Sequence, residues 1–278
     1  MKTITYLFIL ILSALFNVLF GQSQNIDSLL KKLPEHVEQN KSIPTGYQMI
    51  TDYHDYDLAG NFIRKIRVSG KYTCGLKGGR VRWNDVTVAH SNQLNEAYPP
   101  GIKQTAMDGF NYLPNTNILD AAFYDQLPDA NFLIKNLLWD TFGFEGFASW
   151  YWDSLKLNDD YAANELNTTV DMAGQGTFTN KEFKLRWLGI TKMNNKICAI
   201  ISYSTMNNKV TLTEGELSLQ GRSHYWGEVY VSLQSQQLEY AKLTEDVITD
   251  VKFTNQQNNV LGYTVRYITF TKLDTIEK

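Results

Sequence analysis

The alternation of apolar and polar side chains changes period several times along the chain. From Thr45 to about Ser91 the period is two, which is typical of strands with one buried and one hydrated face. This pattern predicts strands over 47–56, 62–74 and 80–90. Glycine-containing segments separate the strands, and glycine readily adopts the positive φ that hairpin turns need. We therefore expect three antiparallel strands in the first part of the domain.

A second alternating region runs from about Asn164 to the end of the chain. Two of its short connections are the same tetrapeptide, Met-Asn-Asn-Lys, at 193–196 and 206–209, and asparagine tolerates the left-handed backbone of a tight turn. With the first three strands, this region predicts one antiparallel sheet of about ten strands, wide enough to curve or close. Its predicted strands are 168–178, 182–192, 196–206, 209–220, 223–234, 237–252 and 261–273.

A helical and irregular insertion, at about 92–160, separates the two alternating regions. Its first part, 92–130, is rich in proline and is predicted to be a loop that covers part of the fold. Asp129 is the predicted N-cap of a helix that ends near Phe142, and this helix should be buried because apolar side chains surround most of it. A shorter amphipathic helix, kinked by proline, is predicted over 26–40.

Together these elements predict a mainly β (α+β) fold. We expect one curved antiparallel sheet or half-barrel of about ten strands, with helices packed in its concave side. A closed barrel of the lipocalin type is the alternative, although its meander lacks a long central insertion. In outline the predicted arrangement resembles the half-barrel of periplasmic lipoprotein carriers and related lipid-binding lipoproteins. The resemblance is architectural, rests on no motif and transfers no functional residue.

The first residues have the order of a secretory signal peptide. Lys2 precedes an apolar run over 4–20, which polar residues follow. The run is short for a transmembrane helix, which needs about 20 apolar residues. An uncleaved anchor is the alternative, since Leu19 stands where a cleavage site favours a small residue. We predict a signal peptide over 1–21 and a single β-rich domain over 22–278, periplasmic or extracellular, without an integral membrane segment.

Composition and charge narrow the classes of function. The 278 residues include 26 Lys+Arg and 29 Asp+Glu, a net charge of −3, without the basic excess of a nucleic-acid-binding protein. Two cysteines are too few for a four-thiolate zinc site. In an oxidising compartment Cys74 and Cys198 could form a disulfide, and a buried thiol at Cys198 is the alternative.

The densest chemical feature is the aromatic run from Phe142 to Trp152. One interpretation is a plug that fills the core, because aromatic side chains dominate ordinary cores. The other is the wall of an apolar cavity, since ligand pockets are mostly apolar with a few polar groups. On the second interpretation the predicted ligand contacts are Phe144, Trp150, Trp152, Trp187, Tyr203 and Trp226.

A second candidate patch lies in the predicted strand over 223–234. His224, Trp226 and Glu228 share one face with Tyr230, and we include the first three among the predicted ligand-binding residues. His224 and Glu228 are ~13 Å apart along a strand, too far to share a proton without partners from other strands. Candidate partners on neighbouring strands are Glu214, Glu216, Tyr240, Lys242 and Asp246.

A further histidine, His54, lies among acids in the segment Tyr53–Asp57, where Asp52, His54 and Tyr56 share a face. We interpret this segment as a solvated strand, because metal-ligand spacing is absent.

The sequence carries no nucleophile elbow, zinc-protease motif, P-loop or dinucleotide-binding loop. We therefore predict no catalytic residue, metal or cofactor. The predicted function is an exported non-enzymatic protein that binds an apolar or amphipathic ligand, such as a lipid or acyl chain, and no nucleic acid. One alternative is an extracytoplasmic glycan hydrolase with paired carboxylates such as Glu214, Glu228 and Asp246. Another is an envelope or surface assembly component whose sheet edges pair with another chain.

Overall fold

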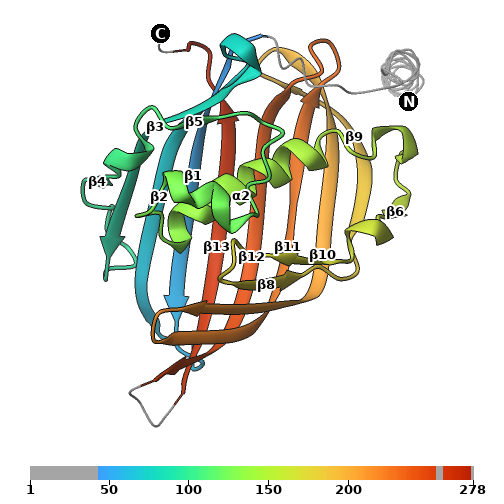
Figure 1. The fold of residues 1–278 in the computed structure, drawn as a ribbon. Helices are drawn as coiled ribbons and strands as arrows, with labels where there is room; N and C mark the ends of the chain where they lie inside the picture. The colour runs from blue at the N-terminus through green and yellow to red at the C-terminus, as the bar shows by residue number, and fades with distance from the viewer. Residues whose placement is uncertain (1–42, 255–258, 277–278) are drawn as a thin grey trace, which may run out of the picture. The chain divides into compact units, whose positions relative to one another are not determined.

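The computed structural model describes residues 43–254 and 259–276, which belong to one compact unit, Val37–Lys278. The predicted signal peptide and the predicted helix over 26–40 lie outside the described residues. Within the described ranges most residues are in strands, and these strands join in one 13-stranded antiparallel sheet (Figure 1). The prediction of a mainly β fold with one large antiparallel sheet is confirmed.

The long strands form the middle of the sheet, in the order β3–β2–β1–β13–β12–β11–β10. The central pairing joins β1 to β13, with Tyr47 opposite Lys272 and Tyr56 opposite Tyr263. The first strands of the domain thus lie directly beside its last strand. The bounds of the long strands are β1 Thr45–Tyr56, β2 Phe62–Cys74, β3 Val81–Ser91, β9 Lys184–Met193, β10 Lys196–Glu214, β11 Leu217–Ser232, β12 Leu238–Phe253 and β13 Val260–Lys272.

Short strands and single helical turns complete the edges of the sheet. In the described part of the chain the strand order begins at β4 and ends at β7, and these two strands do not pair. The sheet is therefore open, and the closed-barrel alternative is wrong. The short strands are β4 Ile102–Lys103, β5 Asn111–Tyr112, β6 Asp160–Ala162, β7 Thr169–Asp171 and β8 Gly176–Thr179. The 3-10 turns are η1 Lys77–Gly79, η2 Thr105–Met107, η3 Ala121–Gln126, η4 Trp152–Ser154 and η5 Asn164–Leu166.

The predicted division of the chain into strands 196–206 and 209–220 is wrong. β10 runs through both segments, and its register against β11 shifts between Thr205 and Asn208. The turn that ends β10 lies instead near Gly215, where the φ of +59° suits glycine. β11 therefore begins at Leu217, earlier than the predicted 223–234.

The two identical Met-Asn-Asn-Lys segments have different conformations. At 193–196, Asn194 and Asn195 have φ of 48° and 60° and form the predicted turn between β9 and β10. In the second copy Asn207, with φ of 59°, forms a β-bulge inside β10. Its backbone N–H donates to Nδ1 of His224 at 3.1 Å. The same four residues therefore make a turn or a bulge according to the strand pairing around them.

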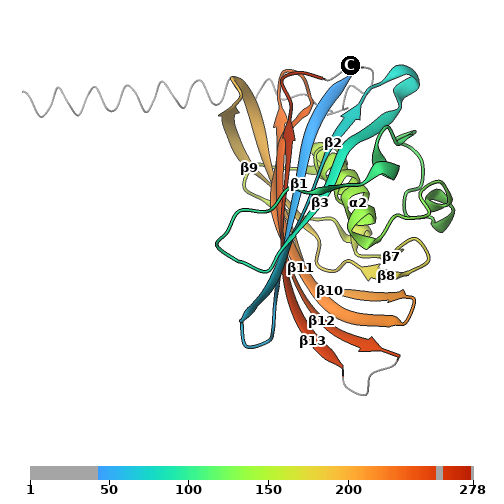
Figure 2. The same cartoon turned by 90° about the vertical axis from the view of Figure 1, so that its left-hand side faces the viewer.

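Helix α2 (Phe132–Phe147) lies against one face of the sheet (Figure 2). Its N-cap is Asn131, whose side chain accepts a hydrogen bond from the N–H of Ile134, and not the predicted Asp129. The helix also continues beyond the predicted end at Phe142, because Phe144 and Phe147 are buried against the sheet.

We call the face of the sheet that contacts α2 the α2 face and the opposite one the outer face. Aromatic rings fill the space between the helix and the α2 face. The ring of Phe144 lies 5.9 Å from that of Phe270, and the ring of Phe147 lies 4.4 Å from Tyr203 and 5.2 Å from Phe183. These contacts match the prediction that the aromatic run of the helix plugs the core.

An ionic cluster also joins α2 to the sheet. Arg266 on β13 forms ion pairs with Asp140 on α2 and with Glu245 on β12. The side chains are largely buried, with 11% of Arg266 and 14% of Asp140 exposed. Burial raises the pKa of Asp140 to about 6, although attraction to Arg266 opposes this shift. Two carboxylates thus share one guanidinium beneath the helix.

Gly227 on β11 leaves room for the side chain of Tyr203, which extends from β10 across β11 to β12. Tyr203 on β10 is paired with Gly227, and its hydroxyl donates to the carbonyl of Lys242 on β12 at 2.7 Å. A Cβ at Gly227 would lie 2.0 Å from that carbonyl oxygen and 2.4 Å from the tyrosine hydroxyl. Backbone and hydroxyl therefore both exclude a side chain at this position.

Gly227→Ala is expected to lower the free energy of unfolding by about 1–3 kcal/mol, because the added methyl must displace the Tyr203 hydroxyl. Urea denaturation followed by circular dichroism measures the change. Gly143→Ala in α2 is the matched control, since a Cβ there meets nothing closer than 3.6 Å. This control should be as stable as the wild type or more so. If Gly227→Ala is as stable as the wild type, the Tyr203 side chain does not fill the space over Gly227.

Candidate functional site

The residues predicted to bind a ligand are divided between the two faces of the sheet. Phe144 and Tyr203 lie in the core on the α2 face, and Trp152 packs against that core while partly exposed. Trp150, which follows the helix, is 45% exposed. Trp187 is half-buried on β9, where its indole N–H donates to the carbonyl of Gly189 at 2.9 Å. These residues stay predicted ligand contacts, although the core members already contact other core rings, Phe144 that of Phe270 and Tyr203 that of Phe147.

The remaining predicted residues, His224, Trp226 and Glu228, lie on the outer face. Their orientation follows from β11, because the ring of the intervening Tyr225 contacts Phe183 on the α2 face. Trp226 is 43% exposed. The sequence prediction that these three side chains share a face is consistent with this arrangement.

Pairing of β1 with β13 brings a second aromatic group to the same face. His54 and Tyr56 alternate with Tyr53, which contacts α2 through Asn136, so they point to the outer face. The rings of His54 and Tyr267 are 5.5 Å apart, and those of Tyr56 and Tyr263 are 6.0 Å apart. Tyr267 is 46% exposed. We call His54, Tyr56, Trp226, Tyr263 and Tyr267 the aromatic platform.

The two most exposed rings of the aromatic platform stand in one row across the sheet. Trp226 is paired with Thr244 on β12, and Thr244 is paired with Tyr267 on β13. Neighbouring strands are ~4.8 Å apart, so the backbones of Trp226 and Tyr267 are separated by about 10 Å. Thr244 stands between these two residues in the row.

Charged groups beside the aromatic platform are paired with one another. Glu228 forms an ion pair with Lys242 at 2.9 Å and accepts a hydrogen bond from the Tyr230 hydroxyl at 2.6 Å. Although burial acts to raise the pKa of Glu228, these hydrogen bonds from Tyr230 and Lys242 lower it overall. A carboxylate held ionised in this way is poorly suited to act as a general acid.

The same pairing occurs on the β1 and β2 side. Arg67 donates two hydrogen bonds of 2.7 Å to Asp52, and its guanidinium lies 4.3 Å from the ring centre of Tyr98. Lys65 donates to the backbone carbonyl of Leu94 at 2.9 Å. The segment that contains Leu94 and Tyr98 therefore covers β2 on the outer face and borders the aromatic platform. The sequence predicted a covering role for part of the 92–130 loop.

Several polar partners of the platform were predicted and others were not. Lys242 and Asp246 stand opposite Glu228 and His224 on β12, as the sequence allowed. The backbone of Glu216 lies at the hairpin turn, and the side chain of Glu214 is outside the described part. Tyr263 and Tyr267 were missed, although their spacing of four residues, an even number, places both on one face of β13. His54 was interpreted as a solvated strand residue because its pairing with β13 could not be seen.

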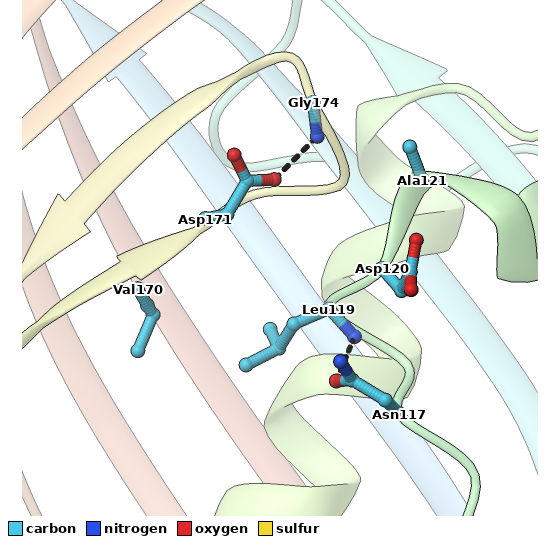
Figure 3. Close-up of a pocket in the computed structure, with 7 residues that line it drawn as sticks. All are labelled: Asn117, Leu119, Asp120, Ala121, Val170, Asp171 and Gly174. Carbon is cyan, nitrogen blue, oxygen red and sulfur yellow. Dashed lines mark hydrogen bonds between the residues drawn. The ribbon is translucent and has the colours of Figure 1, made fainter.

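An open hollow on the other side of the molecule is a weaker candidate (Figure 3). It has a volume of about 490 Å³. Its polar groups are committed to local turns, since Asp171 accepts from the N–H of Gly174 and Asp120 accepts from the N–H of Ala122. The hollow is lined by Asn117, Leu119, Asp120, Ala121, Val170, Asp171 and Gly174.

Within residues 43–254 and 259–276, no three or more His, Cys, Asp and Glu side chains gather into a metal-binding group, and no helix has the length and hydrophobicity to cross a membrane. Cys74 and Cys198 are not joined by a disulfide: the Cys74 thiol contacts the carbonyl of Thr45, and Cys198 is buried.

The sequence of this chain matches no protein-family model and has no significant match among curated proteins.

Proposed function

We propose that the protein is an exported non-enzymatic binding protein that holds an amphipathic ligand against its outer face. The aromatic platform is the observation that carries this proposal. Trp226 and Tyr267 are both nearly half exposed, and rings on a surface attract ligands with apolar faces. Export is proposed from the predicted signal peptide.

The ligand is proposed to lie on the outer face of the sheet and not in the interior between α2 and the sheet. A guest between α2 and the sheet would have to separate rings that are already in contact, such as Phe147 and Tyr203 at 4.4 Å. We also propose that α2 occupies the concave side of the sheet. This arrangement leaves the outer face as the surface on which a ligand displaces nothing but water.

The hydrolase alternative receives less support from the described carboxylates. Glu228 is ion-paired with Lys242, and Asp246 accepts a hydrogen bond from the Tyr263 hydroxyl at 3.1 Å. A hydrolase needs one carboxyl that keeps its proton and one that does not. Binding without turnover is therefore the function that we propose.

Dodecyl maltoside, kept below its micelle concentration, is the probe for a first test because it carries both an alkyl chain and an uncharged sugar. Isothermal titration calorimetry should detect binding to the wild-type protein. Trp226→Ala and Tyr267→Ala should each weaken binding by about tenfold, since each removes one ring from the contact surface.

Phe142→Ala is the matched control. This phenylalanine is 42% exposed, close to the 43% of Trp226, but it lies on α2, where its ring is 5.5 Å from that of Trp150. Its replacement should leave the affinity unchanged. Equal losses in all three variants, or binding that none of them alters, would overturn the assignment of the ligand to the outer face.

A further inference from the structure

We infer that the ligand is an uncharged glycan chain, which lies across β11, β12 and β13 with sugar rings on Trp226 and Tyr267. This inference rests on the proposed function and specifies its ligand class. It is carried by the placement of the two exposed rings, the pairing of the nearby charges and the openness of the surface.

The placement of the rings suits a repeating ligand. Trp226 and Tyr267 occupy one cross-strand row, about 10 Å apart, with Thr244 between them. Sugar rings present C–H groups on their flat faces and hydroxyls at their edges. A chain that follows the row can therefore place apolar faces on the two rings and a hydroxyl near the threonine.

The charges beside the row favour an uncharged ligand. Glu228 is paired with Lys242 at 2.9 Å, and Asp52 is paired with Arg67 at 2.7 Å. An anionic ligand would have to compete with a carboxylate for each of these cations. Hydroxyl groups make no such demand, because they donate to carboxylates and accept from cations without breaking the pairs.

Polar atoms lie at the margins of the platform, where sugar hydroxyls would reach. Asp246 stands opposite His224 on the neighbouring strand and accepts a hydrogen bond from Tyr263. A carboxylate retains acceptor capacity after one hydrogen bond. The platform thus combines ring faces with hydrogen-bonding groups, the two features that a glycan requires.

The openness of the surface argues against an acyl chain. Pockets for apolar small molecules enclose most of the ligand surface. Trp226 and Tyr267 belong to the pleated surface of one sheet, which can cover a ligand from one side. An acyl chain would leave its other side in water, whereas the outer hydroxyls of a glycan remain favourably hydrated there.

The test uses the full mature chain and a panel of uncharged hexasaccharides: maltohexaose, cellohexaose, laminarihexaose, xylohexaose and chitohexaose. Decanoate and decyl dimethylamine oxide serve as probes that carry an alkyl chain without sugar. Calorimetry is run on the wild type, Trp226→Ala, Tyr267→Ala and the Phe142→Ala control. We expect at least one hexasaccharide to bind, with about tenfold weaker binding in the first two variants and no change in the control.

The outcomes separate the two proposals. If the alkyl probes bind in a Trp226-dependent manner and no hexasaccharide does, the glycan inference is overturned while the proposed function stands. If no probe binds to the outer face, both are overturned. Unchanged thermal unfolding of Trp226→Ala and Tyr267→Ala would show that lost affinity does not reflect loss of the fold.

Discussion

Replacing Arg266 by methionine is expected to reduce the free energy of unfolding by about 3–5 kcal/mol at pH 8. Arg266 is the cation to which both Asp140 and Glu245 are paired. Methionine keeps much of the side-chain volume but leaves two largely buried carboxylates without that partner. Their mutual repulsion and lost hydration then oppose the docking of α2, and urea denaturation followed by tryptophan fluorescence measures the loss.

Arg64→Met provides the comparison. Arg64 pairs with Asp55 at 2.7 Å on the neighbouring strands β2 and β1, but its side chain is 54% exposed against 11% for Arg266. An exposed ion pair contributes at most about 1 kcal/mol, so this variant should remain close to the wild type in stability. Similar losses in both variants would show that burial of the cluster beneath α2 is not what makes Arg266 important.

Strand positions were largely readable from the sequence because they depend on local alternation. β2 coincides with the predicted 62–74, and β13 differs from the predicted 261–273 by one residue at each end. The break predicted near Asn207 failed for a different reason. A left-handed asparagine suits both a turn and a bulge, and the choice depends on pairing with β11, which a single sequence does not reveal.

The candidate site was harder to predict because it depends on which strands become neighbours. The patch around Trp226 was visible within one strand, and its partner Lys242 follows from the hairpin between β11 and β12. His54 precedes Tyr267 by more than two hundred residues, and the two meet through the pairing of β1 with β13. Register between distant strands is set by the packing of the whole sheet, so local patterns could not bring these rings together.

Asp140 gives the folded state an expected dependence on pH. Burial raises its pKa to about 6 against the opposing attraction of Arg266, whereas an unfolded aspartate has a pKa of about 3.9. Between these values the folded state retains a proton that the unfolded state has lost. The contribution of Asp140 to stability therefore falls as the pH rises through this window, by at most about 3 kcal/mol.

The measurement compares wild type with Asp140→Asn by urea denaturation at intervals from pH 4 to pH 7. Because the asparagine does not titrate, the stability of the wild type relative to this variant should decrease as the pH rises. Asp160→Asn is the control, since a hydrogen bond from Arg186 lowers the pKa of Asp160 and its contribution changes below this window. If the stability of the wild type relative to Asp140→Asn instead stays level or rises with pH, Arg266 keeps Asp140 ionised throughout. Ion pairing would then outweigh burial under the helix.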